Sequence, residues 1–171
     1  MAYFNSILIS GVVTVLVVLL AGMVAFAMVR YRFRGRRFLD SLIIASLMFP
    51  VFSTIIPVFQ MLSAINVTDS PVGVILPQIA GNLSFAMVIL MGYIRGLPVD
   101  LEESAFLEGC NVFQVFYKVI LPVCRPAFAT VAIFSFLWSY NDLFTQLFFL
   151  RSPEKWTITR FLNEVSSQFG T

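Results

Sequence analysis

The sequence predicts an all-α polytopic membrane protein with four transmembrane helices and one long cytoplasmic loop built from two short helices. Of its 171 residues, 59% are apolar and only 12% are charged, and the mean hydropathy is +0.91. Soluble domains average roughly 45–50% apolar and about 25% charged residues. Four apolar stretches, each near the roughly 20 residues that a helix needs to cross a bilayer, alternate with polar segments. Too few polar side chains remain to cover the surface of a soluble domain.

The four apolar stretches are the predicted membrane spans. A cleavable signal peptide is not favoured at the start, because residues 1–29 carry no charge and the first apolar run is long enough to cross a bilayer. The predicted spans are residues 7–29, 38–62, 72–94 and 127–150.

The second span contains Pro50 and Pro57, seven residues apart and therefore on one face of a helix. Each proline removes one backbone hydrogen bond and bends the helix. Two interpretations stay open: a kink that packing tolerates, and a bend around an internal cavity.

The positions of the arginines predict the orientation. Residues 30–37 hold five arginines, and residues 95–126 hold three more basic residues, so these two segments carry eight of the eleven Lys and Arg. The positive-inside rule then makes both segments cytoplasmic and turns the N-terminus outward. Either the first helix inserts as a reverse anchor, or a segment upstream is missing.

Several kinds of site are excluded by what the sequence lacks. It has no histidine, its two cysteines (Cys110 and Cys124) are separated by thirteen residues, and it contains no phosphate-binding G-x-x-x-x-G-K-[ST] motif. A net charge of +2 is too small to suggest nucleic acid. We therefore expect no catalytic residue, no metal site and no ATP bound by this chain.

The cytoplasmic segment, residues 95–126, carries signals for two short helices. Asp100 and Glu103 match a capping box that would begin a helix over residues 101–108, and Gly109 suits the positive φ that ends one. Asn111 and Gln114 form a second box-like pair. The second helix is expected to run to about residue 120, before Pro122.

Residues 101–109 read L-E-E-S-A-F-L-E-G, and after nine further residues V-I-L-P follows at 119–122. This segment resembles the EAA loop of ABC importer permeases, whose pattern is E-A-A-x-x-x-G, nine residues, then I-x-L-P. The chain departs from it at Ser104 and Val119, and at Cys110, where alanine is common.

Two further segments extend the resemblance over essentially the whole chain. Residues 32–36 are similar to the R-F-x-G-[KR] turn of the family. Trp138, Asn141 and Asp142 are similar to the W-N-[DE] region of its carbohydrate-uptake branch, with two residues inserted. The resemblance implies the MetI-like permease fold. Because members of the family have a further helix at each end, the chain looks truncated at both.

The resemblance also implies a function and partners. The chain would be a non-enzymatic permease subunit for a sugar or oligosaccharide in a bacterial or archaeal plasma (inner) membrane. It would pair with a second permease subunit, a cytoplasmic ATPase dimer that holds ATP and Mg²⁺, an extracytoplasmic solute-binding protein and membrane lipid. Phe113 and Phe116 would supply apolar surface to the ATPase groove or to the chain's own helices. The implied ATPase-coupling residues are Glu103, Ser104, Ala105, Gly109, Phe113, Phe116, Leu121 and Pro122.

A possible substrate path rests on polar side chains inside the apolar stretches. An unpaired charge such as Asp142 costs about 2.5–3.5 kcal/mol at a helix centre on insertion scales. Asp142 therefore has either a structural partner or a place on the path. The path candidates are Asn141, Asp142, Gln78 and Asn82, although hydrogen bonds between helices explain them equally well.

Two alternative functions remain open at this point. The EAA loop is shared by ABC permeases for phosphate, polyamines and peptides, so another solute fits it too. A non-ABC membrane transporter or interaction protein is the other alternative. A secondary transporter favours ionisable groups at mid-membrane and internal repeats, whereas this sequence shows one such acid and no repeat.

Overall fold

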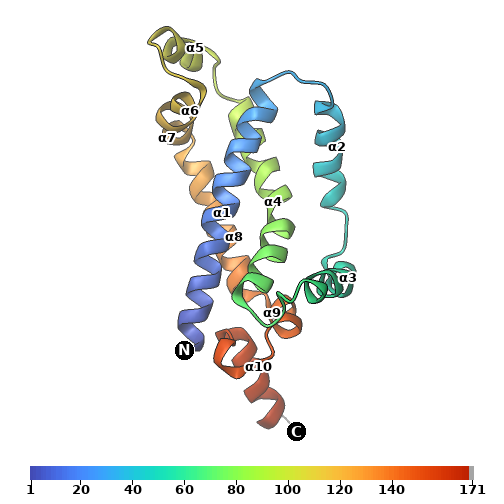
Figure 1. The fold of residues 1–171 in the computed structure, drawn as a ribbon. Coiled ribbons are helices and arrows are strands. Elements are labelled where there is room, and N and C mark those ends of the chain that lie inside the picture. The colour runs from blue at the N-terminus through green and yellow to red at the C-terminus, as the bar shows by residue number, and fades with distance from the viewer. Residues whose placement is uncertain (170–171) are drawn as a thin grey trace. The chain divides into compact units, whose positions relative to one another are not determined.

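The computed structural model describes residues 1–169, apart from the side chains at positions 51, 52 and 169, and in that range it is helical without strands (Figure 1). The predicted all-α fold is confirmed. The helices are α1 (Ala2–Arg30), α2 (Arg36–Ser46), α3 (Val51–Ala64), α4 (Pro71–Arg95), α5 (Asp100–Leu107), α6 (Val112–Val115), a π-helical turn (Phe116–Ile120), α7 (Leu121–Val123), α8 (Arg125–Asn141), α9 (Leu143–Phe149), a 3-10 turn (Pro153–Lys155) and α10 (Ile158–Phe169).

The chain divides into two compact units. The first unit comprises Met1–Leu16, Phe49–Asn82 and Phe134–Thr171. The second unit comprises Val17–Met48 and Leu83–Ile133. Each unit has its own buried apolar residues, such as Val74 and Phe149 in the first and Leu90 and Ile120 in the second.

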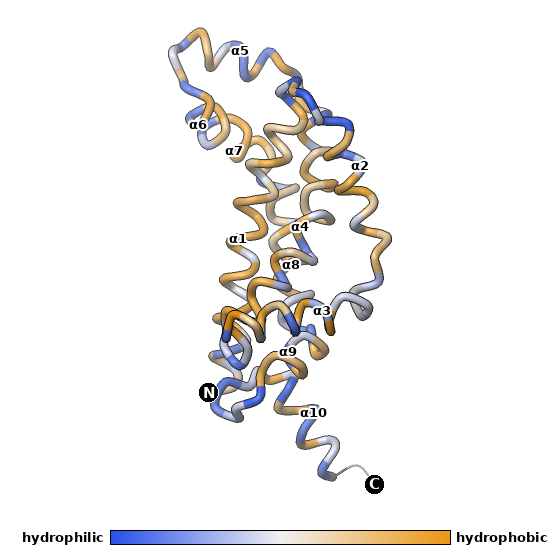
Figure 2. Tube along the Cα trace, turned by 45° about the vertical axis from the view of Figure 1, so that its right-hand side comes forward, coloured by the Kyte–Doolittle hydropathy of each residue, from blue (hydrophilic) through white to orange (hydrophobic). Residues whose placement is uncertain are grey.

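Helix α1 is apolar all round, yet only one of its faces is buried. Figure 2 shows α1 in apolar colours over most of its length and the connection from α1 to α2 in hydrophilic colours. The buried positions Ile9, Val13, Val17, Ala21 and Ala25 are spaced by four residues, which places them along one side of the helix. Toward the end of the helix the buried positions Ala21 and Ala25 are small, and small residues let helices approach closely.

The predicted four spans are not reproduced as four long helices. Among residues 1–169, only α1 and α4 are long and apolar enough to cross a membrane alone. A third span results if Val112–Val123 and Arg125–Asn141 count as one, although the two are bent by 82°.

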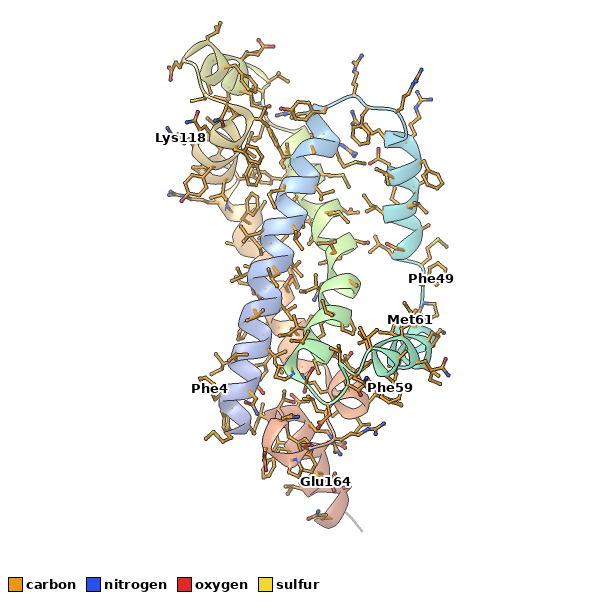
Figure 3. The ribbon with its side chains drawn as sticks, in the orientation of Figure 1. Phe4, Phe49, Phe59, Met61, Lys118 and Glu164 are labelled. Atoms are coloured by element: carbon orange, nitrogen blue, oxygen red, sulfur yellow. The ribbon has the colours of Figure 1, made fainter. Side chains whose placement is uncertain are left out.

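The second predicted span is broken rather than kinked. Helix α2 ends at Ser46, and Pro50 precedes α3 with φ −68° and ψ 123°, an extended conformation. The residue before a proline is disfavoured in helical geometry, and proline has no N–H to continue the ladder. Phe49, within the break, is exposed (Figure 3), whereas Pro57 lies inside α3.

The fourth predicted span is also interrupted. Helix α8 ends at Asn141, and Asp142 adopts an extended conformation (φ −72°, ψ 92°) as the N-cap of α9. Its Oδ1 accepts a hydrogen bond from the Thr145 N–H at 3.1 Å. Because aspartate is among the best N-cap residues, it ends one helix and begins the next.

Candidate functional site

The turn between α5 and α6 has the geometry that the sequence predicts. Gly109 has φ +84°, which favours glycine. The Gly109 N–H donates to the Phe106 carbonyl and the Cys110 N–H to the Ala105 carbonyl, both at 3.0 Å. These two bonds form a Schellman motif, which satisfies the last carbonyls of α5.

Helix α6 begins with the predicted capping box. Asn111 Oδ1 accepts from the Gln114 N–H, and Gln114 Oε1 accepts from the Asn111 N–H, each at 2.9 Å. The two side chains therefore satisfy each other's backbone donors.

The other predicted capping box, Asp100 with Glu103, is wrong. Helix α5 begins one residue earlier than predicted, so Asp100 is its first residue and Val99 is the N-cap, without a side-chain cap. The Glu103 N–H donates to the Val99 carbonyl at 3.1 Å, whereas the predicted box has the Asp100 side chain as its acceptor.

Pro122 does not end the second helix as predicted. The chain continues through the π-helical turn into α7, and Pro122 lies near the start of α7, where a missing N–H is tolerated. The bend instead occurs at Cys124, with φ −86° and ψ 9°.

The two-helix loop, residues 95–126, exposes large apolar side chains together with one motif glutamate. Leu107 is 90% exposed, Phe113 78% and Tyr117 70%. Glu103 is exposed too, as is Lys118, labelled in Figure 3 on the π-helical turn. Of the other motif residues, Ser104 is exposed and Ala105 is buried.

Phe116, unlike Phe113, is half-buried. Its ring lies 5.6 Å from the ring of Phe26 and 6.4 Å from that of Phe128, between centroids. Of the two roles considered for the phenylalanines, Phe116 thus packs on the chain's own helices and Phe113 is left exposed. Leu121 and Pro122 are half-buried.

A buried ion pair beneath α5 was missed by the sequence reasoning. Arg30 Nε donates to Glu102 Oε1 at 2.5 Å, and the two side chains are only 11% and 5% exposed. Arg30 Nη2 also donates to the Leu97 carbonyl at 3.1 Å. The partners are 72 positions apart, so no local spacing signals the pair.

In the first unit, a buried polar cluster joins five side chains. Gln78 Nε2 donates to Asp142 Oδ2 at 2.9 Å, and Ser139 Oγ donates to Gln78 Oε1 at 2.5 Å. Gln146 Nε2 donates to the Ser139 carbonyl at 3.1 Å, and Thr157 Oγ1 donates to Gln146 Oε1. Asp142 therefore has structural partners on both oxygens.

The remaining path candidates, among the described residues, make no side-chain hydrogen bond to this cluster. Asn141 is exposed, and its Nδ2 donates to the Leu137 carbonyl at 2.7 Å. Asn82 is 5% exposed, and its Nδ2 has no hydrogen-bond partner among the described residues. The structure thus brings together Gln78 and Asp142 and leaves a buried amide donor on Asn82.

Asp69, between α3 and α4, is a second polar centre that the sequence reasoning missed. Its carboxylate accepts hydrogen bonds from the Arg151 and Ser152 N–H groups, both at 2.9 Å, and from Ser152 Oγ at 2.5 Å and Lys155 Nζ at 3.2 Å. The Ser152 hydroxyl, followed by its N–H, holds the pKa of the Asp69 carboxyl well below its ordinary range. Within residues 1–169, no three Cys, Asp or Glu side chains gather in a way that could hold a metal ion.

Replacing Asp142 by alanine is expected to lower the free energy of unfolding by about 2 kcal/mol, because α9 loses its cap and Gln78 a partner. Asp142→Asn should cost less than half of that, since asparagine caps helices as well as aspartate. Thermal unfolding in detergent micelles measures both variants. Equal losses in the two would contradict the capping role.

Comparisons with known proteins agree on one family. A sequence model of the family described as "Binding-protein-dependent transport system inner membrane component" matches residues 17–170. The chain is 35% identical over 158 residues to the diacetylchitobiose uptake system permease protein NgcG of Streptomyces coelicolor, covering 92% of this chain and 52% of that protein. It is 38% identical over 146 residues to the trehalose transport system permease protein SugB of Mycobacterium tuberculosis, covering 85% and 53%.

A solved structure has the same fold. A chain of a bacterial ABC transporter involved in the import of the acidic polysaccharide alginate matches with a TM-score of 0.87 and 24% sequence identity, covering 99% of this chain and 59% of that chain. The chain thus spans little more than half the length of these proteins.

Proposed function

Because the chain belongs to the family of binding-protein-dependent transport system inner membrane components, we propose that it is the permease subunit of an ATP-driven importer for a sugar or oligosaccharide. The names of the relatives support the solute class, since NgcG and SugB are named for the uptake of diacetylchitobiose and trehalose. In this proposal the chain binds no cofactor, and ATP and Mg²⁺ are held by a separate ATPase.

The observation that carries the proposal is the set of exposed apolar side chains on the two-helix loop. Leu107, Phe113 and Tyr117 are each at least 70% exposed, with the exposed carboxylate of Glu103 on the same loop. Exposed apolar side chains in a group are typical of protein docking sites. Their proposed occupant is the cytoplasmic ATPase dimer, with Glu103 supplying a polar contact.

The proposed topology treats residues 1–171 as one permease domain with four crossings. Helices α2 with α3, and α8 with α9, each form one broken crossing, which a membrane protein tolerates where other protein or water covers the break. The segments 30–37 and 95–126 are cytoplasmic and the N-terminus faces outward, a choice supported by eight of eleven basic residues in those segments. A second permease subunit, an extracytoplasmic solute-binding protein and lipid complete the assembly.

The proposed substrate path uses Gln78, Asn82, Asn141 and Asp142. Asn82 has the best support, because its buried Nδ2 is an unused donor among the described residues and sugar hydroxyls accept hydrogen bonds. Gln78 and Asp142 already bind each other, so their contribution is to hold α4 and α9 in place beside the path.

The docking proposal is tested by replacing Glu103 with glutamine in the assembled transporter. The amount of ATPase that co-purifies should fall about tenfold, since a hydrogen bond to a charged group contributes roughly 1.5–3 kcal/mol. Quantitative immunoblotting of the purified complex measures the ratio of ATPase to permease.

The matched control is Glu108→Gln, which removes the same charge from another exposed glutamate five residues along. It should retain the wild-type ratio. Wild-type ATPase recovery in the Glu103 variant, with normal solute uptake, would contradict docking through this carboxylate.

A further inference from the structure

We infer that the buried ion pair between Arg30 and Glu102 fastens the two-helix loop to α1, so that a displacement of α5 is transmitted to the end of α1. This inference rests on the proposed function, because it is the ATPase that would displace α5. Arg30 and Glu102 are positioning residues in this role and contact neither nucleotide nor solute.

Arg30 is hydrogen-bonded to two different segments. It is the last residue of α1, and its guanidinium donates to Glu102 on α5 at 2.5 Å and to the Leu97 carbonyl at 3.1 Å. One side chain at the end of α1 therefore holds both α5 and the connection between α4 and α5.

Arg30 differs from the other arginines of the basic segment. Arg32, Arg34 and Arg37 are exposed, and Arg36 lies 4.0 Å from Asp40 with its side chain 28% exposed. Charges of that kind suit topology and lipid headgroups. Arg30 is instead directed into the protein, at the edge of the same charged run.

The two neighbouring glutamates of α5 face opposite environments. Glu102 is buried and bound to Arg30, whereas Glu103 is exposed. Successive helix residues are separated by about 100° around the axis, so one residue can face the protein while the next faces a partner. A displacement of Glu103 is therefore passed to the adjacent residue Glu102, and through its carboxylate to Arg30.

A second attachment lies one turn before Arg30. Phe26 packs on Phe116 of the π-helical turn, with 5.6 Å between ring centroids, and Phe116 in turn packs on Phe128. Phe26 and Arg30 are four residues apart and therefore lie on the same face of α1. With an ion pair and an aromatic contact on one face, the last two turns of α1 and the loop move together.

The ion pair has the burial needed to persist during such a movement. Removing one partner of a buried pair leaves an uncompensated charge, which is strongly unfavourable, whereas an exposed pair exchanges readily with water. The buried pair is thus expected to stay formed, unlike a transient ion pair on the surface.

The test uses the assembled transporter in liposomes and measures two quantities: ATPase retained per permease, and solute molecules carried per ATP hydrolysed. The variants are Arg30→Gln, Glu102→Gln and the double variant with both changes. The double variant leaves no unpaired buried charge, so it can be measured even if a single variant does not fold. All should retain the ATPase, while solute carried per ATP falls about tenfold. Arg30→Lys keeps the charge opposite Glu102 and should restore most of the coupling.

Arg32→Gln is the matched control, because it removes an exposed arginine two residues along, and its coupling should equal that of the wild type. Wild-type solute carried per ATP in the double variant, or an equal loss in Arg32→Gln, would overturn the inference. Failure of the proposed function has a different signature: the unmodified chain itself would retain no ATPase, and Glu103→Gln would change nothing.

Discussion

Replacing Asp69 by alanine is expected to lower the free energy of unfolding by about 2–4 kcal/mol. The Asp69 carboxylate accepts four hydrogen bonds, from Arg151, Ser152 and Lys155, and its loss leaves these donors without their acceptor. Asp69 also has φ +56°, a conformation that aspartate tolerates and alanine disfavours. Denaturant unfolding in micelles measures the loss, and one below about 0.5 kcal/mol would show that water replaces these bonds freely.

The same residue predicts a pH dependence with a definite sign. The Ser152 hydroxyl and N–H hold the pKa of folded Asp69 below its unfolded value, so its stabilisation is fully present above that unfolded value. The advantage of the wild type over Asp69→Asn should be constant between pH 5 and 7 and shrink below about pH 4, as the unfolded carboxyl binds protons. An advantage that grows on acidification would reverse the sign and contradict the prediction.

Gly73→Ala is expected to destabilise the protein by about 1–3 kcal/mol, as overpacking does. A Cβ on Gly73 would lie 2.5 Å from the backbone carbonyl oxygen of Val67, and backbone moves aside less easily than a side chain. The Gly73 N–H also donates to Ser70 Oγ at 3.1 Å, which fixes the approach of α4 to the preceding loop. The unfolding midpoint in denaturant measures the effect.

The control for Gly73 is Gly92 on the same helix. A Cβ there meets nothing within 4 Å, so Gly92→Ala should be neutral or stabilising by up to about 1 kcal/mol. If both variants lost the same stability, the cause would be a general intolerance of α4 to alanine rather than the contact with Val67.

Local features of the fold were predictable because their causes are local. Uninterrupted apolar runs predicted α1 and α4, whose ends lie within a few residues of the expected spans 7–29 and 72–94. Gly109 and the pair of Asn111 with Gln114 were predicted because a turn and a cap depend on residues within one helical turn.

The predictions that were wrong concern features that depend on competition between neighbouring residues or on distant partners. Pro50 and Asp142 are the N-cap residues of α3 and α9, so each divides one predicted span into two helices. Hydropathy alone did not show these breaks. The predicted Asp100 box was wrong by one residue, because α5 begins at Asp100 and Val99 occupies the N-cap position.

The long-range polar pairs inside each unit had no signal in the spacing. Arg30 with Glu102, and Asp69 with Ser152, join positions 72 and 83 residues apart, and only the fold brings them together. What the sequence does show is that Arg30 directly follows one apolar run and Asp69 lies between two, where a charged side chain needs a partner.

The turn between α5 and α6 has a consequence for binding. Its Schellman motif and its capping box already satisfy the backbone groups at the facing ends of the two helices, using only the loop's own residues. The turn is therefore preorganised, and a partner that binds it pays little conformational entropy to order it. Affinity is then set by the side chains that the turn displays, and it can be tuned one residue at a time without rebuilding the shape that presents them.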